Sequence, residues 1–124
     1  MTDCLFCDIP NDRIISANEH AYAVRDGFPV TDLHTLINPM RHTASYFDLN
    51  QVEMGACNEL LILMKLQVLD LDDTVSGFNI GINIGEDAGQ TIFHCHIHLI
   101  PRRQGDVENP RGGIRGVIPN KQSY

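Results

Sequence analysis

Histidines occupy alternate positions in one short segment of the chain, at His94, His96 and His98. Imidazole is a metal ligand, a nitrogen nucleophile and an acid or base near neutral pH, so such a group can bind a metal, attack a phosphoryl group or transfer protons. Side chains alternate across a β-strand, so a strand over residues 92–100 places the three imidazoles on one face. The other face then carries the apolar side chains Phe93, Cys95, Ile97 and Leu99.

Two cysteines lie close together near the N-terminus, Cys4 and Cys7, with the C-x-x-C spacing of a zinc knuckle. Tetrahedral zinc needs two further thiolates or imidazoles, and we expect Cys57 and Cys95 to be buried, which leaves the histidines as the supply. The alternatives are two ordinary cysteines or a redox pair, but a redox C-x-x-C normally opens a helix after a strand. We therefore favour a Cys2His2 zinc site.

The histidine segment also fits phosphoryl transfer. A neutral imidazole can attack phosphorus to form a phosphoramidate, and a neighbouring imidazole can stabilise the phosphoryl oxygens or protonate the leaving group. Gly89, Gln90 and Thr91, just before the histidines, could donate hydrogen bonds to a phosphate. Any one histidine could be structural, but three in register on one face favour chemistry.

The composition indicates a single domain. The chain has 124 residues, 43% of them hydrophobic, with a net charge of −7, which argues against a stable nucleic-acid partner. No stretch approaches the roughly 18 consecutive apolar residues of a membrane span, and the N-terminal residues lack a secretory signal pattern. The cysteine spacing does not fit a disulfide framework, so we expect a cytoplasmic protein with no membrane partner.

Local residue patterns predict the strands and the helix that position these residues. We expect a strand over residues 21–25, a turn over 26–29, and a strand over 34–38 that Pro39 ends. We expect one long helix from Leu49 to about Leu71, with Asp48 and Gln51 as a capping-box variant.

A strictly alternating strand follows over residues 78–85, whose polar face holds only glycine and asparagine and leaves room for a ligand. Strands and one long helix without regular alternation indicate an α+β fold with an antiparallel sheet. Residues 105–124 are rich in glycine, proline and basic residues, and we expect an extended tail there.

The long helix has more apolar positions than one core face requires. Met54, Leu61, Ile62 and Val68 widen its apolar stripe. Either a partner subunit covers the excess, or the helix lies deep against the sheet.

The segment from His94 to Ile100 resembles the His-φ-His-φ-His-φ-φ signature of the histidine triad (HIT) superfamily of nucleotide hydrolases and transferases. The resemblance covers most of residues 4–103 and includes Asp26 before His34, the segment 36–42, and Ala88 to Thr91. Two positions depart from the usual pattern: Asn38 before Pro39, and Leu33 where the family usually has glycine.

The resemblance implies a role for each matching residue. His96 is the nucleophile that attacks the α-phosphate, His98 contacts the phosphate and the bridging oxygen, and His34 is a fourth histidine lining the site. Asp26 matches the position that hydrogen-bonds the ribose. The positions around the phosphates are Asn83, Gly89, Gln90 and Thr91.

In the C-x-x-C branch of the family the resemblance further implies a zinc ion on Cys4, Cys7, His42 and His94. Four protein ligands leave no position for water, so this zinc is expected to be structural, tying the N-terminus to the segment that carries His96.

The resemblance implies a HIT-like fold over residues 1–104, with a five-stranded antiparallel sheet, one long helix and one or more short ones. It also implies a homodimer that extends the sheet, with the tail of residues 105–124 packed on the same domain or on the partner. The expected function is hydrolysis or transfer at the α-phosphate of an AMP-containing nucleotide, such as a diadenosine polyphosphate, through a nucleotidyl-histidine.

Three alternatives stay open. One is an adenosine phosphoramidate hydrolase, which uses the same chemistry. Another is a nucleotide-binding interaction protein with little turnover. The third is a zinc-stabilised structural module in which all the histidines bind metal.

Overall fold

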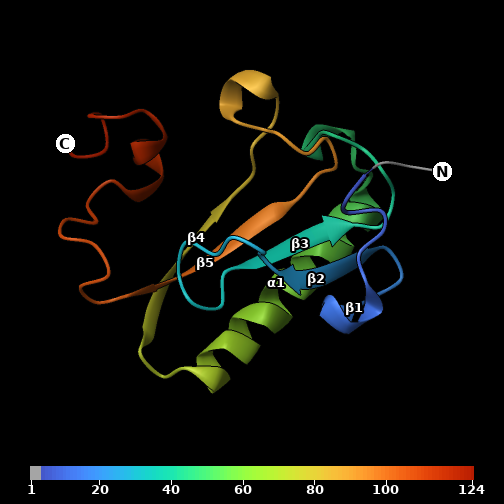
Figure 1. Ribbon diagram of the computed structural model, residues 1–124, viewed down its shortest axis with the longest axis horizontal. Helices are drawn as coiled ribbons and strands as arrows, with labels where there is room; N and C mark the ends of the chain where they lie inside the picture. The colour runs from blue at the N-terminus through green and yellow to red at the C-terminus, as the bar shows by residue number, and fades with distance from the viewer. Residues whose placement is uncertain (1–3) are drawn as a thin grey trace.

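The computed structural model describes residues 4–124, which form a five-stranded antiparallel sheet with one long helix across one face (Figure 1). The order of the strands in the sheet is β1-β2-β3-β5-β4. The strands are β1 (Ile14–Ala17), β2 (Ala21–Arg25), β3 (Thr35–Pro39), β4 (Val75–Gly81) and β5 (Ile97–Arg103). The helix is α1 (Gln51–Leu71), and short 3-10 turns are η1 (Asn11–Arg13), η2 (Tyr46–Asp48), η3 (Glu86–Ala88) and η4 (Gly113–Val117). The predicted α+β class and five-stranded sheet are confirmed.

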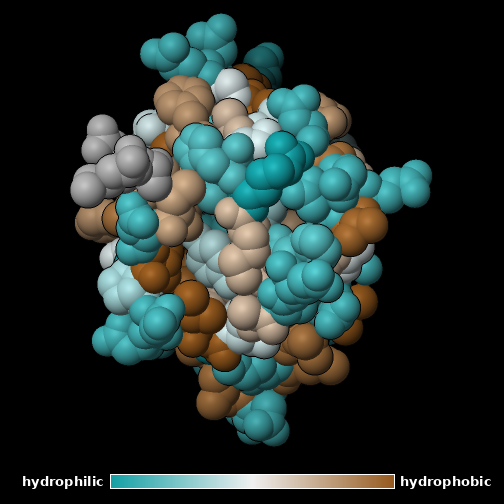
Figure 2. All heavy atoms as spheres, turned by 90° about the vertical axis from the view of Figure 1, so that its right-hand side faces the viewer, coloured by the Kyte–Doolittle hydropathy of each residue, from teal (hydrophilic) through white to brown (hydrophobic). Residues whose placement is uncertain are grey.

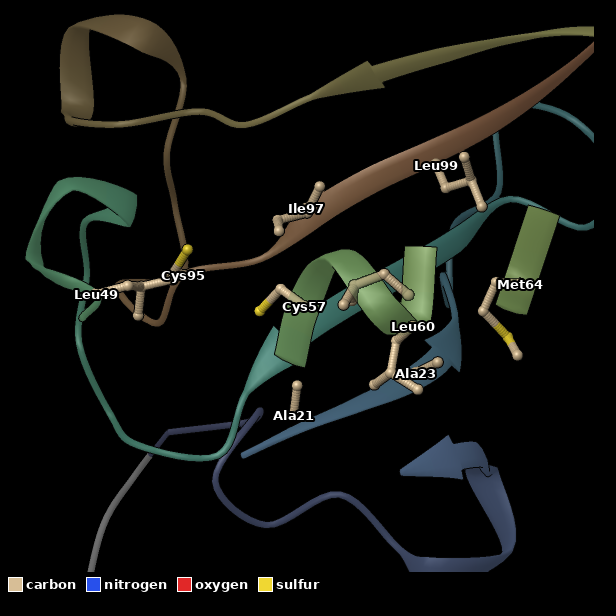
Figure 3. Packing of buried hydrophobic residues seen from close by; sticks show 10 residues of the cluster. Ala21, Ala23, Leu49, Cys57, Leu60, Met64, Cys95, Ile97 and Leu99 are labelled. Carbon is tan, nitrogen blue, oxygen red and sulfur yellow. The ribbon is translucent and has the colours of Figure 1, made fainter. Parts of the chain in front are cut away.

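The main core lies between α1 and the sheet, because one side of the helix is apolar and the facing strand residues are small or β-branched. The helix contributes Cys57, Leu60, Met64 and Val68, all buried. Figure 3 shows Cys57 and Leu60 facing Ala21 and Ala23 of β2 and Ile97 and Leu99 of β5. Cys57 and Cys95 are both buried, as predicted, and burial raises the pKa of each thiol, to about 12 and about 11 respectively.

The start of α1 differs from the prediction. The N-cap is Asn50, whose side chain accepts from the Glu53 backbone N–H, while the Glu53 carboxylate accepts from the Asn50 backbone N–H. The predicted Asp48–Gln51 pair is wrong, because Asp48 closes η2 and buried Leu49 follows it before the helix begins. Asn50 and Glu53 have the same three-residue spacing as Asp48 and Gln51. A capping box was therefore predicted correctly, but its position was wrong by two residues.

The strand boundaries also differ. The strand over residues 21–25 is confirmed, and β3 ends at Pro39, as predicted, whereas Pro101 lies inside β5. Neither proline breaks a ladder. Beyond Leu99, β5 pairs only with β4, so a residue without an N–H is tolerated at Pro101. Edge strand β1 has no counterpart in the sequence prediction, because four residues are too few for a clear pattern.

The face of the sheet opposite α1 is covered on its β2 and β3 side by the N-terminal segment. Phe6 is buried there with Tyr22, Val24 and Leu36. Figure 2 shows the side at the right of Figure 1, which polar residues largely cover, with apolar residues interspersed. The β5 and β4 side of the same sheet face carries His98, Ile100 and Arg102, all half-buried.

The outer surface of α1 retains exposed apolar side chains. Ile62, Leu63 and Leu66 are 52%, 44% and 56% exposed, and Ile80 on edge strand β4 is 53% exposed. Of the four positions predicted to widen the apolar stripe, Val68 is buried and Met54 and Leu61 pack partly buried against the core, so only Ile62 stays exposed. Among the described residues, no helix is long and apolar enough to span a membrane.

Candidate functional site

The three histidines do not share one strand, contrary to the prediction. β5 begins at Ile97, so only His98 lies in it, and His94 and His96 precede it. His94 turns into the protein and is fully buried, while His96 stays beside His98 with ring centroids 5.3 Å apart. Phe93, predicted to be in the core, is 49% exposed because it also precedes the strand. The segment thus separates one buried imidazole from two that remain accessible.

Four residues from three distant segments meet beside the start of β5. The ligand atoms of Cys4, Cys7, His42 and His94 all lie within 4.8 Å of one another. Cys7 Sγ is 3.3 Å from His42 Nδ1 and 3.5 Å from His94 Nδ1, and Cys4 Sγ is 3.5 Å from His94 Nδ1. Tetrahedral zinc with its usual bond lengths to sulfur and nitrogen places such atoms about 3.6 Å apart. The spacing therefore fits zinc.

The orientation of His94 supports a metal-ligand role. Its Nε2 lies 2.7 Å from the Pro39 carbonyl oxygen, which can only accept, so Nε2 carries the proton. The Nδ1 lone pair is then directed at the two sulfur atoms. A backbone acceptor on the far nitrogen is the usual partner of a metal-bound histidine, because it selects the tautomer and holds the ring. Burial lowers the pKa of His94, so the imidazole is neutral, as a ligand must be.

A carbonyl acceptor also determines which nitrogen of His96 is unprotonated. Its Nδ1 lies 2.8 Å from the carbonyl oxygen of His94 and therefore donates to it. A neutral ring with its proton on Nδ1 has an unprotonated Nε2. This nitrogen is a nucleophile or a base, and the half-buried position of the ring leaves it reachable.

A chain of hydrogen bonds through His34 gives His98 the opposite tautomer to that of His96. The Val30 backbone N–H donates to His34 Nδ1 over 3.1 Å, so the His34 proton resides on Nε2. That Nε2 lies 2.9 Å from His98 Nδ1, which accepts, and the His98 proton therefore resides on Nε2. His98 therefore presents an N–H donor on the ring that lies beside the His96 ring.

The protein disfavours a positive charge on the imidazoles of His98 and His34. Burial, together with the neighbouring His96 and His34, lowers the pKa of His98 to about 4, and Asp26 opposes the change. Burial likewise lowers the pKa of His34. Both rings are neutral at physiological pH, and the tautomers described above persist there.

Asp26 lies at the edge of the histidines. Its Oδ2 is 3.4 Å from His34 Nε2 and 3.9 Å from His98 Nδ1, and its Oδ1 accepts from the Phe28 backbone N–H. The predicted turn at residues 26–29 is thus present. Leu33 has a φ of 70°, a left-handed conformation that favours glycine, the residue that the resemblance implies at that position.

The loop before His94 is fastened internally. The Gln90 side chain is buried, accepts from the Gly85 N–H, and donates to the carbonyl groups of Ala44 and Ile92. The N–H groups of Gly89 and Gln90 donate to the carbonyls of Glu86 and Gly85. Gln90 therefore shapes this loop, while Thr91 is exposed.

Asn83 is half-buried and lies two residues beyond Gly81, the partner of His98 in the sheet. Its position follows the end of β4, since the strand stops four residues earlier than predicted. β4 ends there because residues 94–96 have left the ladder.

Two further residues position the site and were missed from the sequence. The buried Phe6 ring packs edge-on against the His96 ring, with centroids 5.0 Å apart, and its carbonyl accepts from the Tyr22 hydroxyl. Its position between the two predicted metal ligands Cys4 and Cys7 was the feature of the sequence that could have identified Phe6.

Arg41, beside His42, is the second missed residue. It makes two hydrogen bonds of 2.9 Å to the Glu53 carboxylate, which fasten the metal-ligand loop to α1.

Comparisons with known proteins identify the family of this chain. A family model described as "HIT domain" matches residues 9–105. An uncharacterised HIT-like protein of Mycoplasma genitalium is 40% identical over 107 residues, covering 82% of this chain and 74% of the relative.

Two solved structures resemble this chain over most of its length. A zinc-bound histidine triad family protein of Mycobacterium smegmatis has a TM-score of 0.76 and 31% identity, over 86% of this chain and 80% of that one. A diadenosine triphosphate hydrolase of Plasmodium falciparum has a TM-score of 0.74 and 30% identity, over 82% of this chain and 68% of that one.

Proposed function

The chain belongs to the HIT domain family, and on this premise we propose that it is a nucleotide hydrolase or transferase that forms a covalent adduct on His96. It acts at the α-phosphate of an AMP-containing nucleotide. The single observation that carries the proposal is the pairing of opposite tautomers: His96 offers an unprotonated Nε2, and His98 beside it offers an N–H.

In the proposed reaction, the His96 Nε2 lone pair attacks the α-phosphorus. A P–N bond forms, the P–O or P–N bond to the leaving group breaks, and the leaving group takes the electron pair of that bond. The His98 N–H donates to the departing atom and stabilises its developing charge. Water then attacks the phosphorus, the P–N bond to His96 breaks, and the nucleoside monophosphate leaves.

Other side chains orient the nucleotide. We assign Asp26 to the ribose hydroxyls, because its carboxylate lies beside His34 and His98 at the edge of the site. Asn83 and Thr91 flank the phosphates. Gly89 and Gln90 shape the loop that presents Thr91.

We assign Cys4, Cys7, His42 and His94 to a structural zinc ion. When bound, zinc supplies a crosslink between the N-terminal segment, the loop after β3 and the segment before β5. His94 is one of the four ligands and also provides the carbonyl that orients His96, so the ligand set and the nucleophile share one short backbone segment.

The apolar surface of α1 and the neighbouring edge strand support a homodimer. Ile62 of α1 and Ile80 of β4 are exposed and line the same hollow, and Leu66 is exposed on the same helix. The outer edge of β4 has no strand partner within the described chain. A second copy pairing along β4 would satisfy that edge and bury these side chains. The expected result is a dimer by light scattering, and a monomer after Ile80→Lys.

Activity is tested by measuring AMP release from diadenosine tetraphosphate and from adenosine 5′-phosphoramidate. We expect His96→Ala to lower kcat about a thousandfold or more, because it removes the nucleophile. His20→Ala is the matched control, since His20 lies outside the site and its N–H, not its ring, bonds Asn18. Rapid quenching should trap nucleotide on the wild-type protein and none on His96→Ala.

Equal rates of AMP release by the wild-type protein and by His96→Ala would refute the proposed enzymatic activity. Nucleotide binding without a trapped adduct would indicate the interaction protein instead. For the metal, we expect one zinc per chain, lost in Cys7→Ser and retained in Cys57→Ala. More than one zinc per chain would favour the all-structural alternative.

A further inference from the structure

The two cysteines of the ligand cluster lie at the surface of the molecule, unlike the other two cysteines of the chain. Cys7 is exposed and Cys4 is half-buried, whereas Cys57 and Cys95 are buried in the core. Cys7 Sγ lies 3.3 Å from Nδ1 of His42, which is also exposed. A small oxidant in solution can therefore reach the Cys7 side of the cluster, while the core shields the other two thiols.

The backbone around Cys4 and Cys7 has the geometry that a disulfide between them requires. The Cys7 N–H donates to the Cys4 carbonyl over 3.2 Å, which closes a tight turn over residues 4–7. The Cα atoms at the two ends of such a turn are less than about 7 Å apart, and a disulfide needs about 4.4–6.8 Å. The two sulfur atoms lie within 4.8 Å of each other. Side-chain rotation therefore suffices to bring them to bonding distance.

A disulfide and a metal ion compete for the same two sulfur atoms. The thiolate is the form of cysteine that binds zinc, so oxidation of Cys4 and Cys7 removes two of the four ligands. A structural zinc site has four protein ligands, and the imidazoles of His42 and His94 alone do not make one. Oxidation of the two cysteines is thus coupled to release of the metal.

The same turn carries Phe6, which contacts the reactive histidine. The Phe6 ring centroid lies 5.0 Å from that of His96. The second contact that orients His96 comes from the His94 carbonyl, which accepts from His96 Nδ1 over 2.8 Å. Closure of the disulfide moves both ends of the turn that holds Phe6, and release of the metal frees the side chain of His94. Both contacts that orient the His96 ring therefore change together.

We infer that Cys4 and Cys7 form a reversible oxidation site, whose disulfide releases the metal and slows the reaction at His96. The loss of activity rests on the proposed function, whereas the disulfide and the release of metal do not. The oxidant is hydrogen peroxide, a small uncharged molecule that reaches the exposed Cys7 side of the cluster.

The oxidation proceeds through two displacements. The Cys7 thiolate attacks one peroxide oxygen, so that an S–O bond forms, the O–O bond breaks and hydroxide leaves. The Cys4 thiolate then attacks Cys7 Sγ, so that the S–S bond forms, the S–O bond breaks and a second hydroxide leaves. The two thiolates together lose two electrons, and peroxide is reduced to two hydroxide ions, which take protons from water. Exchange with an external dithiol reduces the disulfide again.

Trypsin separates this pair of cysteines from the other two, so the modified residues can be identified by mass. Cleavage after arginine and lysine gives peptide 1–13 with Cys4 and Cys7, peptide 42–65 with Cys57, and peptide 66–102 with Cys95. The folded protein is loaded with zinc chloride, treated with hydrogen peroxide and digested. We expect peptide 1–13 to lose two hydrogens, the other two peptides to keep their thiols, and a chromogenic chelator to detect the released zinc.

AMP release is measured on the same samples. We expect oxidation to lower kcat at least about tenfold, and addition of a dithiol and zinc to restore it within about twofold. Cys57→Ala is the matched control and should respond like the wild type, because the Cys57 thiol is buried. Cys7→Ser cannot form the disulfide, so peroxide should change its kcat by less than about twofold.

Retention of zinc with an unmodified peptide 1–13 overturns the inference. Oxidation of Cys7 alone to a sulfinic acid also overturns it, since a dithiol does not reverse that product. A disulfide with full activity refutes the link to His96. These measurements use the wild-type protein and do not depend on whether Cys7→Ser folds. If the untreated protein releases no AMP, the proposed function fails, while the peptide masses and the zinc release still decide whether Cys4 and Cys7 are the oxidation site.

Discussion

Phe6 links the metal-ligand segment to the reactive histidine, and replacing it is expected to slow the chemical step. The ring lies between Cys4 and Cys7 in the sequence, is 6% exposed, and packs edge-on against the rings of His96 and His94 with centroids 5.0 and 6.1 Å away. The Tyr22 hydroxyl, itself a hydrogen-bond acceptor from Asn38, donates to the Phe6 carbonyl. The Phe6 backbone is thus held by Tyr22, while the Phe6 ring contacts the His96 ring.

The choice of substitution follows from the energies. Phe6→Ala would empty a buried aromatic site and cost about 3–5 kcal/mol, a large part of the roughly 5–15 kcal/mol stability of a domain. Phe6→Leu keeps most of the volume and should cost less than about 1.5 kcal/mol. It still removes the edge-on ring contact, which is worth about 0.5–1.5 kcal/mol. If that contact holds the His96 ring in its reactive orientation, kcat falls about two- to twelvefold.

The assay is steady-state hydrolysis, with zinc content and urea unfolding measured on the same preparations. We expect Phe6→Leu to lower kcat, to leave KM within about twofold, and to retain one zinc per chain. Phe47→Leu is the matched control, because Phe47 is 78% exposed. An unchanged kcat in a folded, zinc-loaded Phe6→Leu protein would show that the ring only fills space, and a loss confined to KM would assign it to nucleotide binding.

Three further outcomes follow from the packing and charges. Glu53→Gln should destabilise the protein at neutral pH by at least the ~1 kcal/mol of a helix cap, and the deficit should shrink in acid. The sign follows because Arg41 and Asn50 lower the pKa of Glu53 from its usual 4.5 to about 2, so its contribution is present above pH 4.5 and lost as pH falls toward 2. Urea titrations at several pH values check this, and a constant deficit would contradict it. Leu60→Ala, at a fully buried position, should lower the free energy of unfolding by about 2–5 kcal/mol. A measured change below about 1 kcal/mol would mean that the core closes around the cavity. Gly112→Ala should open the tail to trypsin, since a β-carbon there would lie 1.7 Å from the Gln122 carbonyl oxygen. Gly105→Ala shares the positive φ but meets open space, so equal digestion of both variants would attribute the effect to backbone strain.

The sequence by itself determined the elements whose signals are local. The short apolar run over residues 21–24, followed by Arg25, located β2, and the apolar-rich segment that was predicted to end at about Leu71 located α1. These succeed because a strand or helix repeats its pattern within a few residues. The resemblance also grouped Cys4, Cys7, His42 and His94, which the structure brings within 4.8 Å.

Only the tertiary structure decided how the histidines divide their roles. The pattern of alternate histidines predicted one continuous strand, yet β5 begins at Ile97, which lets His94 turn inward. Its tautomer depends on the Pro39 carbonyl, 55 residues earlier, and that of His98 depends on His34, 64 residues earlier. Such partners meet only when the chain has folded, and hydrogen-bond direction at an imidazole is set by the partner rather than by the residue type. Residue types therefore identified which groups could react, and the folded backbone decided which nitrogen of each one does.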